Sequence, residues 1–416
     1  MTLIKTSVLS AISTIIKVIA GFVSIKVVAV YVGPSGLALI GQMQNFISMM
    51  SSVASAGLNS GVVKYTAEHY EDEQIKQKIW SSALKISLVL IIPIAIGIIF
   101  LADFISMQLL NTAEYSSIFI VFAITVIFFV LNGLLTSILN GQKEIKKLTI
   151  LNIVGSLFGL AVTILLVTQY ELYGALIAGI VSQSIVFFIT LAFVLKSSWF
   201  KLSMFLGSMD KEYRNKLLKY SLMTITYIIT SSLSQIYIRH YLGANIGWDE
   251  AGYWQAIWRI SETYLMLITT TLTIYYLPKL SSIQDKVELR KELLYGYKII
   301  MPIVIVMALG IYIFRDFIIS ILFSEAFSPM AQLFFYQLIG DVIKIAAWLL
   351  GFIMVAKAMT RLSIFSEIFF ACSFVGFVVL FVNIYGLIGV TIAFMVNYLI
   401  YMIFLYFSLR GYLSGE

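Results

Sequence analysis

Long apolar stretches follow one another along this chain of 416 residues, and short polar segments separate them. Each stretch is roughly 20 residues long, which is the length that an α-helix needs to cross the hydrocarbon core of a membrane. Membrane-spanning β-strands would be shorter and would alternate apolar with polar residues, a pattern that this sequence lacks. The apolar pattern therefore predicts an all-α membrane protein with about twelve spans, at 6–32, 37–66, 80–102, 116–140, 147–168, 173–195, 217–241, 251–278, 297–314, 328–355, 362–383 and 386–409.

The composition agrees with a chain that is surrounded mainly by lipid. Hydrophobic residues make up 60% of the sequence and charged residues only 12%, whereas soluble domains carry roughly 25% charged residues. The one cysteine, Cys372, excludes an intramolecular disulfide, and the two histidines, His69 and His240, lack the spacing of metal ligands. We therefore expect no metal and no cofactor. No G-x-x-x-x-G-K-[ST] nucleotide-binding motif occurs, so an H⁺ or Na⁺ gradient is a candidate energy source for any transport.

Lysine and arginine gather in alternate loops, and this distribution predicts the orientation of the spans. The positive-inside rule places the loops richest in Lys and Arg, among them 196–216 and 279–296, in the cytoplasm. Both termini are then cytoplasmic, and the extracytoplasmic loops are short. The net charge of +7 is explained by contact with anionic membrane lipids, so no nucleic-acid partner is expected.

The two halves of the chain resemble each other in sequence. Tyr31-Val32-Gly33 recurs as Tyr241-Leu242-Gly243, Asp103-Phe104-Ile105 as Asp316-Phe317-Ile318, and Tyr173-Gly174 as Tyr385-Gly386, at offsets of 210, 213 and 212 residues. Six spans lie on each side of the division. This predicts two six-helix bundles, residues 1–205 and 206–416, related by a parallel internal repeat. In transporters built this way, the substrate site lies between the halves near the middle of the membrane.

Polar residues form stripes on four of the predicted spans. On an ideal helix the polar residues of each span fall within a narrow arc, and an offset of 210 residues maps Asn45 to Gln255 and Ser52 to Glu262. We interpret the stripes as the lining of one wet cleft, because polar groups are costly in lipid. The alternative is helix–helix contact, in which Ser and Thr are common. The stripes comprise Ser13, Lys17, Ser24 and Tyr31; Asn45, Ser48, Ser52, Ser55 and Asn59; Tyr227, Thr230, Ser234, Tyr237 and Tyr241; and Gln255, Arg259, Glu262, Thr269 and Thr273.

Charged residues inside the predicted spans are the sharper indication of function. Lys17 lies near the middle of the first span. Lys26 lies on the opposite face of the same helix, about 180° around its axis, unless the helix bends at Gly21. The spacings of Arg259 to Glu262 and of Asp341 to Lys344 permit ion pairs along one helix. Each such pair has two interpretations: a structural pair that locks helices together, or a functional group in the cleft.

These residues form the candidate site. Lysine and arginine suit a phosphate or pyrophosphate, amides and hydroxyls suit a sugar, and an acid near buried bases suits a proton or cation. Asp341 and Lys344 are the candidates for coupling or gating, with Gln337 and Trp348 on the same face. The candidates for substrate binding in a central cavity are Lys17, Lys26, Asn45, Ser52, Asn59, Tyr227, Arg239, Gln255, Arg259 and Glu262.

Several strings in the sequence are distinctive. They are Gly33-Pro34-Ser35-Gly36, the segment from Gly247 to Gln255 (GWDEAGYWQ), Tyr276-Leu277-Pro278, the segment from Gln337 to Lys344 (QLIGDVIK), and the pair Lys17 and Lys26. With these strings the chain resembles, over nearly its whole length, the Wzx-type flippases of the multidrug/oligosaccharidyl-lipid/polysaccharide exporter superfamily. Arg259 departs from the common-antigen branch of that family, in which a small polar residue is expected.

The resemblance implies a MATE-like fold of two six-helix bundles around a central cavity. It also implies a flippase that moves an undecaprenyl-pyrophosphate-linked oligosaccharide from the cytoplasmic to the periplasmic leaflet of a bacterial inner membrane. Other glycan-assembly proteins, such as the polymerase, are the partners that the resemblance suggests. The first alternative is a cation-coupled multidrug antiporter of the same fold, which would favour an acidic cavity. The second is a membrane enzyme of the same pathway, such as a polymerase or ligase, which the short extracytoplasmic loops disfavour. We therefore expect a transporter rather than an enzyme.

Overall fold

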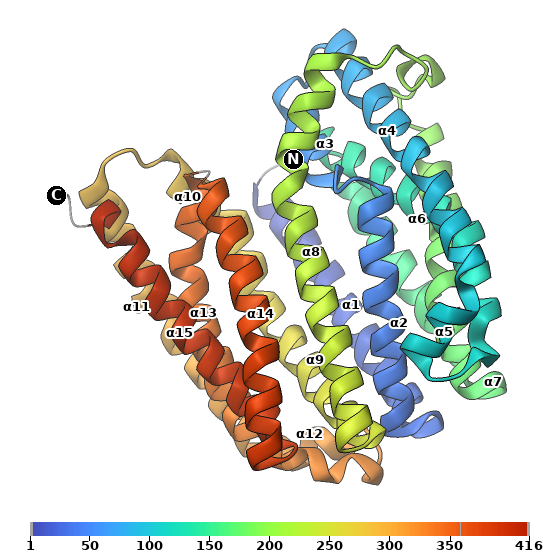
Figure 1. Cartoon of the computed structure of the whole chain (residues 1–416). Helices are drawn as coiled ribbons and strands as arrows, with labels where there is room; N and C mark the ends of the chain where they lie inside the picture. The colour runs from blue at the N-terminus through green and yellow to red at the C-terminus, as the bar shows by residue number, and fades with distance from the viewer. Residues whose placement is uncertain (1–2, 358, 414–416) are drawn as a thin grey trace. The chain divides into compact units, whose positions relative to one another are not determined.

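The computed structural model describes residues 3–357 and 359–413, and every regular element in these ranges is helical (Figure 1). The predicted all-α fold is confirmed. The elements are α1 (Leu3–Tyr31), α2 (Gly33–Ala54), α3 (Asn59–Glu68), α4 (Glu73–Phe100), α5 (Ala102–Leu110), η1 (Ala113–Tyr115), α6 (Ser116–Gly141), α7 (Ile145–Leu195), η2 (Leu202–Met204), α8 (Lys211–Asn245), α9 (Trp248–Thr271), η3 (Leu272–Tyr276), α10 (Leu277–Ser282), α11 (Lys286–Ile313), α12 (Arg315–Leu322), η4 (Glu325–Leu333), α13 (Phe334–Ala356), α14 (Thr360–Tyr385) and α15 (Ile388–Leu413).

The helices agree with the predicted spans. Among the described residues, 8 helices are long and apolar enough to cross a membrane, and the bent pair α2 and α3 makes up to 9. The remaining predicted spans are the second segment of α7 and the more polar helices α8 and α9. The protein is therefore a multi-pass α-helical membrane protein. The outermost residues of both termini, which we expect on the cytoplasmic side, lie outside the described residues.

The long helix α7 is a hairpin of two antiparallel segments. Glu171 has non-helical backbone angles, φ 48° and ψ −123°, and it ends the first segment. The chain then returns so closely that a Cβ atom on Gly174 would lie 1.9 Å from the carbonyl oxygen of Leu166. Further along the same hairpin, a Cβ atom on Gly155 would contact Val186 at 3.5 Å. The predicted spans 147–168 and 173–195 are thus the two arms of α7.

The turn in α7 corrects one of the sequence matches between the halves. Gly386 separates α14 from α15 with φ 60° and ψ −143°, close to the angles of Glu171. A Cβ atom on Gly389 would lie 2.2 Å from the carbonyl oxygen of Phe381, the same close approach that Gly174 makes. The structural counterparts are therefore Glu171 with Gly386 and Gly174 with Gly389. The match of Tyr173-Gly174 with Tyr385-Gly386 was in the wrong register.

Two other matches can be judged by where helices begin and end. The match of Asp103-Phe104-Ile105 with Asp316-Phe317-Ile318 is confirmed, because both strings start at the second residue of a short helix, α5 or α12, directly after α4 and α11. The match of Gly33 with Gly243 is in the wrong register: Gly33 begins α2, whereas Gly243 lies inside α8 and Gly247 precedes α9. The offset of 210 that paired Asn45 with Gln255 is therefore about one helical turn too short.

The chain divides into two compact units, residues 1–32 with 39–232 and residues 33–38 with 233–416. The apolar core of the first unit includes Trp80, Ile138 and Leu217, from α4, α6 and α8. The core of the second unit includes Leu265, Leu349 and Leu405, from α9, α13 and α15. The division of the twelve spans into bundles at residues 205 and 206 stays a prediction.

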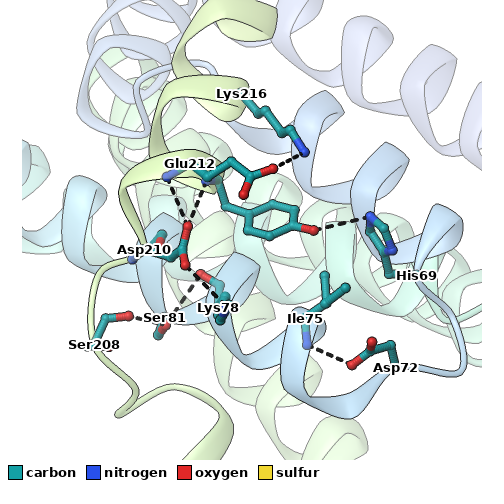
Figure 2. A network of polar contacts seen from close by, with 11 residues as sticks. His69, Asp72, Ile75, Lys78, Ser81, Ser208, Asp210, Glu212 and Lys216 are labelled. Carbon is teal, nitrogen blue, oxygen red and sulfur yellow. Dashed lines mark hydrogen bonds and ion pairs between the residues drawn. The ribbon is translucent and has the colours of Figure 1, made fainter.

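The loop between α7 and α8 is fastened to the first unit by both apolar and polar contacts. The ring of Trp80 packs against those of Trp199 and Phe205, with centroids 5.4 Å and 5.8 Å away. Figure 2 shows the polar part, in which Lys78 on α4 forms an ion pair of 3.3 Å with Asp210. This loop therefore packs as part of the first unit.

Asp210 also begins α8. Its Oδ1 accepts hydrogen bonds from the backbone N–H groups of Glu212 (2.9 Å) and Tyr213 (3.1 Å), as in a helix N-cap (Figure 2). The hydrogen bond from the Tyr213 N–H holds the pKa of Asp210 below its ordinary value, and the nearby Lys78 ammonium lowers this pKa further. Close by, the hydrogen bond to Glu212 raises the pKa of Lys216. The pair of Lys78 and Asp210 ties the start of α8 to α4, whereas the pair of Lys216 and Glu212 lies within α8.

Candidate functional site

A cavity of about 390 Å³ lies within the first unit, between α1, α6 and the two arms of α7. Lys17, one of the predicted binding residues, lines this cavity together with Ser24, about two turns further along α1. The other polar residues that line it come from α6 and α7: Asn132, Thr136, Asn152, Ser156, Thr163, Ser182, Gln183 and Thr190. The cavity is therefore basic and polar, and its lining residues include no carboxylate.

Small residues create the space for this cavity. Gly21, Gly155 and Gly159 all line it, so three positions on α1 and α7 carry no side chain into it. A Cβ atom on Gly21 would have nothing within 4 Å. The helix α1 runs without a break through Gly21, so glycine at this position serves the cavity and does not mark a kink.

Two residues beside the cavity each hold a buried polar atom that lacks a partner among the described residues. The atoms are Oδ1 of Asn132 and Oγ1 of Thr190, and both are shielded from solvent without a hydrogen bond. Thr190 as a whole is 0% exposed. Buried polar groups in native proteins almost always have a partner, so an unsatisfied one calls for an explanation.

Other predicted binding residues of the first unit lie elsewhere. Lys26, Asn45, Ser52 and Tyr227 are not among the residues that line the cavity. Ser52 is buried, and its carbonyl accepts a hydrogen bond from Ser55. Tyr227 is 46% exposed on α8. The roles of these four residues in a central cleft stay predictions.

The polar stripe predicted for residues 45–59 is interrupted. The helix ends at Ala54 and resumes as α3 at Asn59 with a bend of 48°. Ala56 and Gly57 between them both have left-handed backbone angles, φ 50° and 59°. Asn59 therefore does not continue the face of α2. Its side chain instead packs against α6, where a Cβ atom on Gly133 would meet it at 3.0 Å.

In the second unit, Arg239 on α8 is buried and bonded to two amides. Its Nε donates to Oε1 of Gln255 at 2.7 Å, and an Nη donates to Oε1 of Gln235 at 2.9 Å. The guanidinium also lies 5.8 Å from the ring centre of Trp254. Arg239 and Gln255, which were predicted to bind substrate, thus meet each other. The contacts that the structure gives them are those of a polar link between α8 and α9.

Asp341 on α13 is the centre of a second buried cluster. Its carboxylate accepts hydrogen bonds from the hydroxyls of Ser261 (2.6 Å) and Tyr264 (2.9 Å) on α9. The amide of Gln337, one turn earlier on α13, donates to the same carboxylate at 3.3 Å. Asp341 is 0% exposed, so this charge is solvated by side chains of the protein alone.

Lys344 lies in an aromatic cage. Its Nζ lies over the rings of Trp348 (4.9 Å), Trp258 (5.6 Å), Tyr398 (5.8 Å) and Phe394 (5.9 Å). Such rings attract a cation through the negative charge of their faces. Among the described residues, no ion pair within 4.0 Å joins Lys344 to Asp341. The spacing of Asp341 and Lys344 permits a direct ion pair, but the two side chains do not form one.

Glu262 and Arg259 lie on the same helix, α9. The carboxylate of Glu262 accepts a hydrogen bond of 2.8 Å from Nε1 of Trp258, whose ring also faces Lys344. Arg259 is half-buried. On α8, Ser234 and Tyr241 form hydrogen bonds with Ala371 and Asn383 of α14, so this part of the α8 stripe makes helix–helix contacts.

Sequence reasoning missed several residues of these clusters. Ser261 and Tyr264 next to Asp341 lie outside the predicted stripe of α9, on its buried side. In the first unit, Asn132 with Thr136 and Asn152 with Ser156 are polar pairs one turn apart in strongly apolar spans. That spacing could have identified them. No three His, Cys, Asp or Glu side chains in the described part of the chain could together hold a metal.

Comparison with known proteins agrees with this architecture. The family described as "Polysaccharide biosynthesis protein" matches residues 27–332. The lipid III flippases of Escherichia coli K12 and Shigella flexneri are each 29% identical to this chain over 401 residues, 96% of both chains.

Solved structures show the fold. A multidrug resistance MATE family transporter of the MOP superfamily, in an inward-facing conformation, superimposes with a TM-score of 0.82 at 16% identity, covering 96% of this chain and 95% of that one. A MOP superfamily transporter from Pyrococcus furiosus, described as having a binding pocket of reverse polarity, gives a TM-score of 0.73 at 18% identity, over 99% and 96% of the two chains. The chain therefore belongs to the polysaccharide biosynthesis protein family and has the fold of the MATE transporters.

Proposed function

We propose that the protein is a flippase that moves an undecaprenyl-pyrophosphate-linked oligosaccharide from the cytoplasmic to the periplasmic leaflet of a bacterial inner membrane. The similarity to lipid III flippases over 96% of both chains supports this function. The observation that carries it in the structure is the chemistry of the cavity beside α1. Lys17 supplies a positive charge, and amides and hydroxyls supply the polar groups that a glycan needs.

The charge of this cavity argues against a drug antiporter. A cationic drug would be repelled by Lys17, and the residues that line the cavity include no carboxylate to attract it. In the second unit, the buried acid Asp341 is already satisfied by Ser261, Tyr264 and Gln337. Both lipid III flippases and MATE proteins are named as transporters, which supports a transporter over an enzyme of the same pathway.

The proposed cycle is alternating access. The glycan and pyrophosphate would enter from the cytoplasm while the prenyl chain stays in lipid, and both termini would be cytoplasmic. Asp341 and Lys344 are proposed as residues that couple transport to H⁺ or Na⁺ or that gate it. Two opposite charges buried on one helix face are costly, and a role in transport would explain why they are there. We also propose that the protein contacts a glycan polymerase after it has moved the glycan across the membrane.

The test is ligand preference in liposomes. We expect the purified protein to bind undecaprenyl-pyrophosphate glycan better than the neutral prenyl alcohol or a cationic dye, with binding that weakens as salt rises because salt screens an open, charged site. The measurement is a quenching titration with the three ligands at two salt concentrations. Preference for the dye would contradict the flippase and favour the antiporter.

A further inference from the structure

The loop between α7 and α8 exposes two leucines on a turn that is fixed in place. Leu202 and Leu206 are 64% and 70% exposed, whereas Met204 and Phe205 between them are buried against the first unit. The backbone N–H groups of Phe205 and Leu206 donate to the carbonyls of Leu202 and Ser203, so these residues form one tight turn. Leucine side chains are stabilised by leaving water. Two of them held outward by an ordered turn indicate a surface that an apolar partner covers.

The contacts of this loop place one end of the turn at the edge of the bilayer. Trp199 packs against Trp80, which begins one of the predicted spans, and tryptophan is enriched at membrane–water interfaces. The carbonyl of Ser203 accepts a hydrogen bond of 2.8 Å from Gln77, which lies about 4.5 Å outside Trp80 along α4. The headgroup layer on each side of the hydrocarbon is roughly 5–7 Å thick. Ser203, next to Leu202, therefore lies at the depth of the headgroups.

The other end of the turn lies at the same depth. The hydroxyl of Ser81 donates to the carbonyl of Ser208 at 3.3 Å (Figure 2). A Cβ atom on Gly207, directly after Leu206, would meet the side chain of Gln77 at 3.1 Å. Both leucines are therefore presented where α4 leaves the hydrocarbon and enters the headgroup layer.

The surface around the leucines is positively charged. Lys196 at the end of α7 and Lys211 at the start of α8 are exposed, and neither forms an ion pair with an acid of the described chain. Exposed apolar side chains beside lysines are typical of a surface that binds the interface of an anionic membrane. The acids of the loop and those that contact it are each paired with a lysine: Glu73 with Lys201, Glu144 with Lys147, and Asp210 with Lys78.

We propose that the loop between α7 and α8 is a docking surface for anionic phospholipids. Leu202 and Leu206 lie among the glycerol groups and the first acyl carbons, and the ammonium groups of Lys196 and Lys211 lie against the phosphates. This surface does not depend on which molecule the protein transports. The helix α8 starts in the first unit and continues into the second beyond Ser232, so the docked loop holds the start of the helix that joins the two units at the membrane surface.

A membrane fits this surface better than a soluble protein does. The loop continues directly from α7, so the spans of the first unit fix its position in the headgroup layer. Headgroup phosphates complement the lysines, and the layer beneath them is apolar enough to receive the leucines. A soluble protein would have to displace lipid from this layer in order to reach the same side chains.

Fluorescence quenching in nanodiscs tests the proposal. In a Cys372→Ser background, Leu206→Cys is labelled with the fluorophore bimane. The quenchers are iodide in the water and lipids that carry a doxyl group near the headgroup, either anionic phosphatidylglycerol or zwitterionic phosphatidylcholine. Gln74→Cys is the matched control, because Gln74 is exposed on α4 and lies roughly 9 Å outside Trp80.

We expect iodide to quench the label at Leu206→Cys several-fold less than the label at Gln74→Cys, and both doxyl lipids to quench it more. At equal mole fractions, phosphatidylglycerol should associate at least about fivefold more strongly than phosphatidylcholine, the factor that one surface lysine gives at about 1 kcal/mol. Iodide quenching as strong as that at Gln74→Cys would show that the leucine faces water. Protection from iodide without quenching by either lipid would show that protein covers it, and each of these results would overturn the proposal.

Removal of charge separates the choice of headgroup from the depth of the loop. Lys196→Gln combined with Lys211→Gln should abolish most of the preference for phosphatidylglycerol and leave the protection from iodide unchanged. The control is Arg290→Gln combined with Lys291→Gln, which removes the same charge from exposed residues of α11 and should change neither result. Equal quenching by the two lipids before any lysine is replaced would contradict an anionic-lipid site. An equal loss of preference in both double variants would contradict it as well, because the net charge of the chain would then explain the preference.

Discussion

Glu171 and Gly386 adopt nearly the same backbone conformation at corresponding turns of the two halves. The angles are φ 48°, ψ −123° for Glu171 and φ 60°, ψ −143° for Gly386. This conformation suits glycine, because a Cβ atom clashes with the backbone there. One half of the repeat therefore has the residue that the turn requires, and the other half holds a glutamate in a strained conformation.

Replacing Glu171 with glycine should relieve this strain. We expect Glu171→Gly to raise the free energy of unfolding by about 1 kcal/mol, since positive-φ strain of a non-glycine residue costs roughly 1–3 kcal/mol and glycine loses some entropy on folding. The measurement is thermal unfolding in detergent. Gly386→Ala should shift Tm in the opposite direction. An unchanged or lower Tm for Glu171→Gly would mean that the turn stores no strain.

Lys17 should be required for transport but not for folding. It lines the cavity beside α1, and it forms no ion pair with the described side chains. We expect Lys17→Ala to lower flipping by about 10- to 100-fold, which corresponds to the loss of one charge-assisted hydrogen bond. Lys17→Arg should keep part of the activity, because the charge remains but its geometry differs. Flipping rates are compared at equal membrane levels, and full activity of Lys17→Ala would exclude an anion-binding role.

Exchanging Asp341 and Lys344 should fail to restore what either single change removes. The two residues have separate surroundings: hydroxyls and an amide surround Asp341, and aromatic rings surround Lys344. The exchange would place a carboxylate against ring faces, which repel it. We expect the double variant to be no more stable than the single variants. Rescue of Tm and flipping by the exchange would show that the two charges act as a direct pair.

Arg239 should be a structural residue. Its guanidinium forms hydrogen bonds with Gln255 and Gln235, and truncating it would remove both of these bonds, of which the one to Gln255 is buried. We expect Arg239→Ala to destabilise the protein by about 1–3 kcal/mol. Arg239→Lys should recover little, because an ammonium lacks the planar fork that reaches both amides. A variant that keeps its Tm but loses substrate binding would instead make Arg239 a binding residue.

The contact between Asp210 and Lys78 should weaken in acid. The pKa of Asp210 is held below its ordinary value, near 3.8, so its charge contributes stability that is present above that value and is lost as pH falls further through the lowered pKa. We expect cleavage by pepsin of the loop at residues 196–210 to increase below about pH 4. Asp210→Asn should be cleaved at higher pH as well, whereas Glu114→Asn, outside this contact, should behave as the wild type.

The sequence by itself determined the class of fold. The length of an apolar run and the thickness of a bilayer are enough to place a span, because every backbone polar group in lipid must bond within its own helix. The N-cap residues Asp72 and Asp285, whose carboxylates cap α4 and α11, are a local signal that could also have placed the starts of these two helices. The polar character of α1, including Lys17 at its middle, was likewise visible in the sequence.

Only the tertiary structure decided which side chains meet. Helical periodicity predicts that Lys17 and Ser24 share a face, but not that this face meets Asn132, more than one hundred residues away. Periodicity also assumes an unbroken helix, and the left-handed residues Ala56 and Gly57 removed Asn59 from the stripe of α2. The spacing of Asp341 and Lys344 permitted an ion pair, yet both side chains instead contact other partners on α9, α13 and α15. Such contacts join distant parts of the chain, so they depend on how the helices pack.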